Sequence, residues 1–440
     1  MPAILILTLG CKLNQLESEA IADAYSAEGY DLHSENSGDP SLIIINTCTV
    51  TSKADQKARR VIRKALRDYP DARVIVTGCY AQLNKDDILK LDTDGKERLS
   101  VAGKDKIISK DKNDLFQFNP KKFSNHTRSF LKIQDGCDKR CSYCKIRLAR
   151  GPSVSLEAEE VLKRLRVLEE THAEAVLTGV NISQYKEQGR KKNLTAQLHG
   201  VTRSEEERAF GLSELLYYLL SGTKKIAIRL SSLAPESADE KLCGILRHPR
   251  IRPHFHLSVQ SGSDKILEKM GRVYNAQTVE RAVSLLRSAK EDPFLACDII
   301  TGFPGETETE FEQTLNLCRK LDFAWIHVFP YSKRQGTPAF SFKGSVTENE
   351  VTKRVRLLTD LAKKGRAEYI RRWIGKEVDV VAENSKKQNP GFYSGVSGNY
   401  LKALVRCTDC NPMTIGKVLR CKLSEIAESE AYDVLAEPVL

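Results

Sequence analysis

The 440-residue chain lacks the features of a secreted or membrane protein. Its apolar start, residues 1–10, is short and is followed by Lys12, so it has neither the basic n-region of a signal peptide nor the length of a membrane span. We therefore expect a first strand over residues 4–9 and a cytoplasmic protein with no membrane partner. With 41% hydrophobic and 29% charged residues, the composition is typical of a globular protein, and the length predicts about three domains.

Acidic residues are too few to balance the basic ones. The chain has 69 Lys and Arg against 58 Asp and Glu, and its net charge of +11 predicts a polyanionic partner. Two segments hold much of the surplus: residues 51–69 have seven Lys or Arg against two Asp, and residues 343–372 have nine against four acids. One such segment alone is also typical of the solvated face of an amphipathic helix. Two of them on one basic chain favour nucleic acid.

Disulfides are not expected in a reducing cytosol, although the chain contains 12 Cys. Cys137, Cys141 and Cys144 have the C-x3-C-x2-C spacing that holds three corners of an iron–sulfur cube. Three thiolates leave one of the four irons without a protein ligand, and such an iron can bind and reduce a substrate molecule. The loop therefore predicts an enzyme that uses iron–sulfur chemistry.

Six further cysteines lie after residue 200 and fall into two groups. Cys407 and Cys410 form a C-x2-C pair without the second pair or nearby His that a zinc site needs, so we expect ordinary thiols there. The remaining four are expected to be buried: Cys243, Cys297, Cys318 and Cys421.

Strand and helix patterns alternate in the first part of the chain. Apolar runs at 4–9, 42–45 and 74–77, with helical patterns at 14–28 and 52–68 between them, predict a doubly wound parallel sheet. Cys11, Cys48 and Cys79 each follow one of these runs. Because the carboxyl ends of parallel strands face one crevice, the three thiols are expected to converge on a second cluster site. The alternative is that they are small buried hydrophobic residues, as one such cysteine alone would be.

A longer α/β alternation begins near residue 128. Strands are expected at 130–133, 175–178, 226–230, 256–259, 296–300 and 325–329, which predicts an incomplete (β/α)6 barrel with its site at the carboxyl ends of the strands. The loop of Cys137, Cys141 and Cys144 follows the first of these strands. Residues 100–127 are expected to be a linker, and residues 186–210 a surface insertion.

The last part of the chain predicts a small antiparallel β-barrel. Segments 377–382, 391–396, 401–406 and 415–423 alternate apolar and polar residues between turn residues. Such barrels often bind RNA. Charge alone does not support that role here, because nine Lys or Arg face nine Asp or Glu from Arg372 onward.

Several strings along the chain resemble one enzyme family. Cys137-Asp-Lys-Arg-Cys141-Ser-Tyr-Cys144 is similar to the signature of radical S-adenosylmethionine (SAM) enzymes. Three N-terminal strings resemble the methylthiotransferases: Thr8-Leu-Gly-Cys-Lys-Leu-Asn-Gln, Ile45-Asn-Thr-Cys-Thr-Val and Val76-Thr-Gly-Cys-Tyr-Ala-Gln. Within the first, Gly10-Cys11-Lys12 followed by Asn14-Gln15 is most similar to the MtaB-type tRNA methylthiotransferases. Further similar strings begin at Leu177, Arg229, Gln260, Gly302 and His327. The resemblance covers nearly the whole chain.

The resemblance implies three domains and one activity. The domains are an N-terminal methylthiotransferase domain (1–115), a radical SAM domain (123–370) and a TRAM-like RNA-binding domain (373–440). The activity is transfer of a methylthio group to C2 of N6-threonylcarbamoyladenosine at adenosine 37 of tRNA, through a 5′-deoxyadenosyl radical. It implies two SAM molecules, two 4Fe-4S clusters, an electron donor of the flavodoxin or ferredoxin type, and a sulfur source.

The resemblance also assigns ligands. Cys137, Cys141 and Cys144 would hold the radical SAM cluster, and the auxiliary cluster would be held by Cys11, Cys48 and Cys79. Five further residues are weaker candidates for contacts with SAM or with the base: Tyr143, Gly179, Arg229, Gln260 and Gly302. The alternative for Tyr143 is an ordinary surface aromatic residue, and the alternative for the two glycines is an ordinary turn after a strand.

The chain departs from the family pattern in three places, and other functions remain open. Pro-Ser-Val-Ser follows Arg150-Gly151 where relatives carry further basic residues, Ser258 replaces a usual Pro, and the insertion at 186–210 is long. The alternatives are methylthiolation of isopentenyl-adenosine in tRNA or of an aspartate in a ribosomal protein. An alternative of another class is a non-catalytic iron–sulfur RNA-binding protein, against which the intact three-cysteine loop argues.

Overall fold

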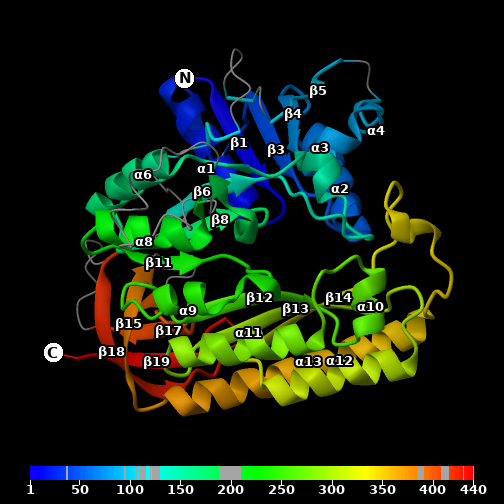
Figure 1. Cartoon of the computed structure of the whole chain (residues 1–440). Coiled ribbons are helices and arrows are strands. Elements are labelled where there is room, and N and C mark those ends of the chain that lie inside the picture. Colours follow the sequence, from blue (N-terminus) through cyan, green and yellow to red (C-terminus); the bar gives the residue numbers. More distant parts are fainter. Residues whose placement is uncertain are drawn as a thin grey trace, which may run out of the picture.

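The N-terminal part of the chain is a parallel sheet, as predicted, but it has five strands where three were expected (Figure 1). The computed structural model describes residues 1–35, 38–93, 96–104, 107–108, 115–118, 120, 129–187, 210–383, 391–407, 416–429 and 431–439. The strand order is β2-β1-β3-β4-β5. The strands are β1 (Ala3–Thr8), β2 (Asp31–His33), β3 (Leu42–Thr47), β4 (Arg73–Gly78) and β5 (Leu99–Val101).

Alternating residues along these strands pack against two helices on opposite faces of the sheet. Leu5, Ile43 and Ile45 share a buried cluster with α2 (Ser52–Asp68). The neighbouring residues Ile4, Leu42 and Ile44 pack instead with α1 (Lys12–Ala27). That second cluster also contains Phe130 and Val176 from the next domain. The α1 helix therefore joins the N-terminal sheet to the barrel.

The next part is the expected incomplete barrel of six parallel strands. Each predicted strand is present: β6 (Ser129–Asp135), β8 (Glu174–Gly179), β11 (Ala227–Leu230), β12 (His254–Gln260), β13 (Phe294–Thr301) and β14 (Trp325–Pro330). Pairing runs β11-β8-β6 and β12-β13-β14, and two isolated parallel bridges, Ile228 to Ile251 and Leu233 to Leu257, join the halves. Among the described strands β6 and β14 do not pair, so the barrel stays open on one side.

The largest buried cluster lies between the barrel strands and the helices outside them. These helices include α6 (Ala158–Thr171), α8 (Leu212–Gly222), α9 (Glu240–Leu246), α11 (Ala276–Ala289) and α12 (Glu308–Leu321). All four cysteines expected to be buried are at most 4% exposed: Cys243, Cys297, Cys318 and Cys421.

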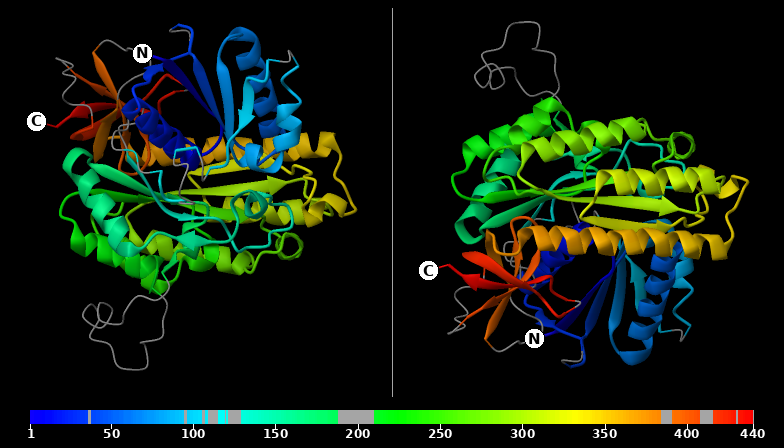
Figure 2. Two further views of the ribbon diagram at one scale, coloured as in Figure 1. Left: turned by 90° about the horizontal axis from the view of Figure 1, so that it is seen from above. Right: turned by 90° about the horizontal axis from the view of Figure 1, so that it is seen from below.

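A 26-residue helix, α13 (Glu348–Trp373), leads from the barrel to a closed five-stranded β-barrel. The small barrel was predicted with four strands, and its fifth, β19, lies beyond them. Its strands are β15 (Glu377–Glu383), β16 (Phe392–Ser397), β17 (Lys402–Arg406), β18 (Val418–Ile426) and β19 (Val434–Pro438). Figure 2 shows this barrel and the N-terminal sheet on the same side of the six-stranded barrel.

Three expectations about connecting segments need correction or restriction. The proposed linker 100–127 is partly folded, because residue 100 lies in β5 and Phe118 is 2% exposed in a core cluster. The proposed insertion 186–210 begins and ends in a strand pair, β9 (Lys186–Glu187) with β10 (Phe210–Gly211), and residues 188–209 lie outside the described residues. Cys407 is disulfide-bonded rather than a free thiol, and Cys410 lies outside the described residues.

In the part of the chain that the structure describes, every helix is too short or too polar to cross a bilayer.

A buried ion-pair group joins the six-stranded barrel to the C-terminal barrel. Arg229 Nε lies 2.7 Å from Glu174 Oε1, and Arg252 Nε lies 2.8 Å from Glu174 Oε2. Arg229 Nη2 also donates to the carbonyl oxygen of Ser397 at 3.1 Å, and the guanidinium stands 5.2 Å from the Tyr400 ring centroid. Both Arg229 and Glu174 are at most 1% exposed, so each charge depends on the others for compensation.

Replacement of Glu174 by glutamine is expected to destabilise the protein by about 3–5 kcal/mol, because it leaves two buried guanidinium groups without their shared counter-charge. Chemical denaturation followed by circular dichroism measures the change. The matched control is Arg281→Gln, which removes one partner of an exposed pair with Glu240 and is expected to leave the unfolding midpoint unchanged. Equal effects of the two variants would contradict a structural role of the buried group.

Candidate active site at the junction of the N-terminal sheet and the barrel

The loop after β6 brings Cys137, Cys141 and Cys144 together at the carboxyl end of the barrel. All three are partly buried free thiols. The loop is held by backbone hydrogen bonds from Cys137 N to Gly151 O at 3.1 Å and from Ser142 N to Met270 O at 2.9 Å. The Ile146 amide donates to Cys144 Sγ at 3.4 Å. Burial nevertheless raises the pKa of the Cys144 thiol to about 11, and the neighbouring Cys141 and Cys137 add to this effect.

Tyr143 packs against Phe303 in a small aromatic cluster beside this loop. The two ring centroids are 6.5 Å apart in an edge-on arrangement. Arg272 donates a hydrogen bond to the Tyr143 hydroxyl, and its guanidinium lies 5.7 Å from the ring centroid. Burial raises the pKa of Tyr143. The ring is thus fixed by the protein, while its contact with SAM remains a prediction.

Cys11, Cys48 and Cys79 lie at the carboxyl ends of β1, β3 and β4, which are adjacent in the sheet. Cys11 is exposed at the N-cap of α1, whereas Cys48 and Cys79 are buried. Two glycines allow this approach: a Cβ on Gly10 would lie 2.7 Å from Cys48 Cβ, and one on Gly78 would lie 2.3 Å from Thr47 O. Both glycines have positive φ angles, of 123° and 96°, where side chains are disfavoured.

Burial, together with a smaller effect of the neighbouring thiols of Cys11 and Cys79, raises the pKa of Cys48 to about 11. Asn14 fixes this edge of the sheet: its Nδ2 donates to Leu9 O at 3.0 Å and to Thr47 O at 3.1 Å. Its Oδ1 accepts from the Cys11 thiol at 3.5 Å. One side chain on α1 therefore ties the loop of Cys11 to the end of β3.

The surroundings of the thiols can be compared with what an iron–sulfur cube needs. Among the described residues, no group of three or more His, Cys, Asp or Glu forms a site for a single metal ion. Thiolates of an iron–sulfur cube bind different irons and so stand further apart than the ligands of one ion. The donors around the thiols also suit anionic ligands: a guanidinium and an ammonium point at Cys79, and backbone amides point at Cys144 and Cys48.

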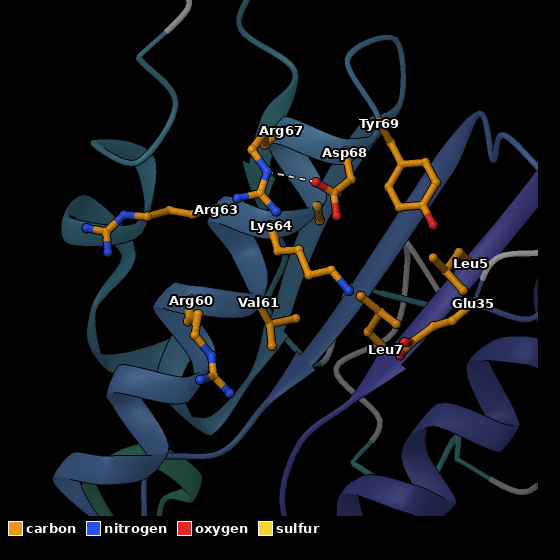
Figure 3. Close-up of a pocket in the computed structure, with 11 residues that line it drawn as sticks. Leu5, Leu7, Glu35, Arg60, Val61, Arg63, Lys64, Arg67, Asp68 and Tyr69 are labelled. Atoms are coloured by element: carbon orange, nitrogen blue, oxygen red, sulfur yellow. Dashed lines mark hydrogen bonds and ion pairs between the residues drawn. The ribbon is translucent and has the colours of Figure 1, made fainter.

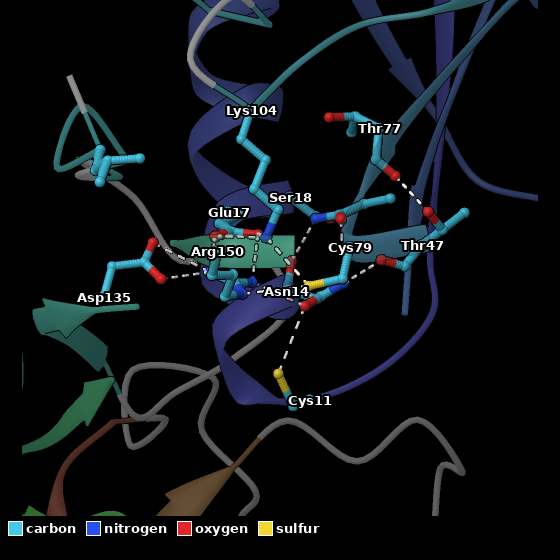
Figure 4. Close-up of polar contacts among 12 residues, drawn as sticks. Cys11, Asn14, Glu17, Ser18, Thr47, Thr77, Cys79, Lys104, Asp135 and Arg150 are labelled. Atoms are coloured by element: carbon cyan, nitrogen blue, oxygen red, sulfur yellow. Dashed lines mark hydrogen bonds and ion pairs between the residues drawn. The ribbon is translucent and has the colours of Figure 1, made fainter. Parts of the chain in front are cut away.

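Arg150 lies beside Cys79, Glu17 and Asp135 (Figure 4). It ends α5 (Ile146–Arg150), directly after the Cys144 loop, and its Nε donates to Cys79 Sγ at 3.2 Å. Its Nη1 lies 2.9 Å from Glu17 Oε1 and 3.1 Å from both Asp135 carboxylate oxygens. Asp135 ends β6, two residues before Cys137. The same guanidinium therefore contacts α1, the barrel and an N-terminal cysteine.

Two lysines complete the buried charges. Lys104 Nζ lies 3.2 Å from Glu17 Oε2 and 3.5 Å from Cys79 Sγ. Lys132 Nζ lies 2.5 Å from Asp135 Oδ2. Burial alone would raise the pKa of Glu17, but Arg150 and the two lysines outweigh it and lower that pKa to about 2. Both carboxylates are therefore ionised at neutral pH, since the same opposing causes lower the pKa of Asp135.

Imidazole and carboxylate side chains line the inside of the barrel. His256 Nε2 lies 2.9 Å from Asp298 Oδ1, and the His256 and His327 rings stack with centroids 5.1 Å apart. Burial and the neighbouring His256 lower the pKa of His327. Lys12, next to Cys11, also adds to this lowering, so the start of α1 reaches toward the barrel interior.

Four of the weaker sequence expectations can be compared with the structure. A Cβ on Gly179 would lie 2.7 Å from Gln134 O, and one on Gly302 would lie 2.5 Å from Val351 Cγ2, so packing alone requires both glycines. Gln260 ends β12 with φ of 69°, a conformation that is uncommon outside glycine and concentrated at functional sites. Arg229 differs from expectation, because its buried contacts with Glu174 and Ser397 give it a structural role. The other contacts to SAM stay predictions.

Sequence reasoning did not find the buried charge group or the histidine pair. Asn14 occurs within a string quoted for the family resemblance, and Arg150 was named only as preceding a departure from the family pattern. Nothing in the sequence showed that Arg150 reaches Cys79. Glu17, Lys104 and Asp135 are ordinary charged residues in the sequence, and only the fold buries them together.

Comparison with known proteins agrees with this geometry. The model described as "Uncharacterized protein family UPF0004" matches residues 3–97, and that of the radical SAM superfamily matches residues 131–318. Threonylcarbamoyladenosine tRNA methylthiotransferase MtaB from Treponema pallidum is 38% identical, over 88% of this chain and 92% of that protein. The proteins of the same name from Thermotoga maritima and Bacillus subtilis are 35% and 32% identical, over 91% and 96% of this chain and 91% and 94% of theirs.

The chain belongs to the MtaB family of tRNA methylthiotransferases. It is therefore a transferase of the radical SAM type that acts on tRNA and uses SAM with a 4Fe-4S cluster. The predicted α/β fold with its radical SAM barrel is confirmed.

Proposed function

We propose that the protein transfers a methylthio group to C2 of N6-threonylcarbamoyladenosine at position 37 of tRNA, using two 4Fe-4S clusters and two SAM molecules. The observation that carries the proposal is the position of the three N-terminal cysteines. They end three adjacent strands of a sheet whose helix α1 packs against the barrel, and Arg150 leads from the Cys144 loop to Cys79. A second site with three thiols, close to the first, accounts for sulfur insertion beside radical formation.

The residues divide the work between two places. Cys137, Cys141 and Cys144 would hold the radical SAM cluster, and Cys11, Cys48 and Cys79 the auxiliary cluster. When bound and reduced, the first cluster supplies the electron that cleaves SAM. Arg272 and Phe303 hold the Tyr143 ring in place beside the first site. Cys11 is the exposed member of its set, so its side of the second site faces the approach of the substrate.

The substrate is tested by nucleoside mass spectrometry of tRNA from a deletion strain. We expect loss of the 2-methylthio form of N6-threonylcarbamoyladenosine, with the unmodified form accumulating, and recovery on complementation with the intact gene. Loss of a methylthiolated isopentenyl-adenosine instead, or an unchanged tRNA together with loss of a methylthiolated ribosomal aspartate, would contradict the proposed substrate. The electron donor would be a flavodoxin or ferredoxin, and a separate sulfur source would restore the auxiliary site.

The tRNA would be bound along α2. Exposed cations occur on successive turns of this helix: Lys53, Lys57, Arg60, Arg63, Lys64 and Arg67. The helix starts at the site, because Thr51 follows Cys48 by three residues and Ser52 N donates to Ser332 Oγ, in the loop after β14, at 2.9 Å. Arg334 in the same loop holds Asp55 at 2.8 Å. If the anticodon loop of the tRNA enters the barrel, the phosphates of the adjoining stem would therefore contact these cations on α2.

A hollow of about 680 Å³ lies beside the far half of α2 (Figure 3). Its walls combine Arg60, Lys64 and Arg67 with the apolar side chains of Leu5 and Leu7 and with the Tyr69 ring. Cations together with an aromatic ring are the usual partners of an RNA backbone and its bases. The second basic segment lies mostly on α13, which runs along the bottom of the molecule in Figure 1, whereas α2 lies in its upper part. We therefore assign the phosphate contacts to α2 and not to α13.

A further inference from the structure

Among the described residues, the buried charge group around Arg150 has one more basic side chain than carboxylates, and the Cys79 sulfur lies beside it. Arg150, Lys104 and Lys132 are three cations, and Glu17 and Asp135 are two carboxylates. All five side chains are at most 9% exposed. An excess charge buried in this way is unfavourable unless an anion compensates it. The nearest candidate is the Cys79 sulfur, to which both Arg150 and Lys104 donate.

Carboxylates hold both Arg150 and Lys104 in the orientation in which they donate to Cys79. Arg150 is held by Glu17 and Asp135 through Nη1, which leaves Nε directed at Cys79 at 3.2 Å. Lys104 is held by Glu17 in the same manner. Hydrogen bonds and positive charge next to a ligand sulfur favour the reduced, more negative state of an iron–sulfur cluster. A fixed guanidinium would exert this effect at every pH, because it does not deprotonate.

We propose that Arg150, assisted by Lys104, is a positioning residue that donates to the Cys79 sulfur and thereby raises the reduction potential of the auxiliary cluster. The inference rests on the proposed function, since it requires a cluster on Cys11, Cys48 and Cys79. The proposal also gives a reason for the contact between the two domains. Arg150 follows Cys144 by six residues in the sequence and forms an ion pair with Asp135. The segment that carries the first site therefore supplies the side chain that tunes the second site.

The test uses full-length reconstituted protein in which Cys137, Cys141 and Cys144 are all replaced by alanine, leaving the auxiliary site alone. Arg150→Met in this background is expected to lower the midpoint potential by about 59 mV, which corresponds to a tenfold change for a one-electron couple. Arg150→Lys, which keeps the charge, is expected to restore part of the difference. Redox titration followed by absorbance and electron paramagnetic resonance measures the potential without any catalytic turnover.

Two further variants separate tuning from folding. Glu17→Gln combined with Arg150→Met removes one carboxylate and one cation, keeps the charge balance, and is expected to fold while still showing the lowered potential. Glu17→Gln alone retains the donor to Cys79 and is expected to change the potential less. An unchanged potential in both Arg150→Met proteins, with only a lower melting temperature, would overturn the proposal. Absence of iron from the background protein with Arg150 intact would instead overturn the auxiliary cluster itself.

Discussion

A Cys141→Ala variant is expected to cleave no SAM at all, whereas a Cys48→Ala variant is expected to cleave SAM and yet form no methylthio product. The reason is the separation of the two cysteine sets. Removal of one of three loop thiols abolishes the cluster that reduces SAM. Cys48 lies in another domain, at the end of β3, and its loss leaves the loop after β6 intact. Anaerobic assays of 5′-deoxyadenosine and of the modified nucleoside measure the two activities separately.

The control is Cys243→Ala, which removes a buried cysteine on α9 that belongs to neither set. It is expected to retain both activities and the full iron content, while each of the other variants loses about half of the iron. Identical loss of SAM cleavage in the Cys141 and Cys48 variants would show that the sites do not act separately. Product formation by the Cys48 variant would remove the N-terminal set from the mechanism.

Much of the architecture could be predicted from the sequence because its strands are continuous apolar runs. Buried parallel strands such as β3, in which every residue is buried, produce such runs, and glycines or cysteines mark their ends. Convergence of Cys11, Cys48 and Cys79 followed from the geometry of a parallel sheet alone. The fifth strand of the C-terminal barrel was missed, and β19 is a short strand of five residues that ends in Pro438.

Buried charge explains most of what the sequence did not reveal. A polar, Lys-rich segment around Lys104 predicted a linker, yet that side chain is buried on Glu17. Arg229 follows a strand pattern and suggested a ligand contact, but its partner is Glu174, 55 residues away. In both cases the role of the side chain depends on an ion pair with a residue far away in the sequence, which the local sequence pattern does not reveal. The same reason concealed the contact between Arg150 and Cys79.

Neutralising the row of cations on α2 is expected to weaken tRNA binding about tenfold or more, with no effect on SAM cleavage in the absence of tRNA. The variant carries Arg60→Gln, Arg63→Gln, Lys64→Gln and Arg67→Gln, all at exposed positions. Each lost phosphate contact lowers the slope of log affinity against log salt by about one, so a decrease of about four is expected. Binding of unmodified tRNA across a salt series, together with KM and kcat, measures the effect.

The matched control changes the same number of exposed cations on α13: Lys353→Gln, Arg356→Gln, Lys363→Gln and Lys364→Gln. Both variants lower the net charge of the protein by four, so a general loss of attraction between a basic protein and RNA would affect them equally. Only a binding surface that follows α2 from the active site predicts a larger effect for the first variant. Equal salt slopes in the two variants would exclude α2 as the tRNA surface, and a larger loss in the α13 variant would move that surface to the far side of the barrel.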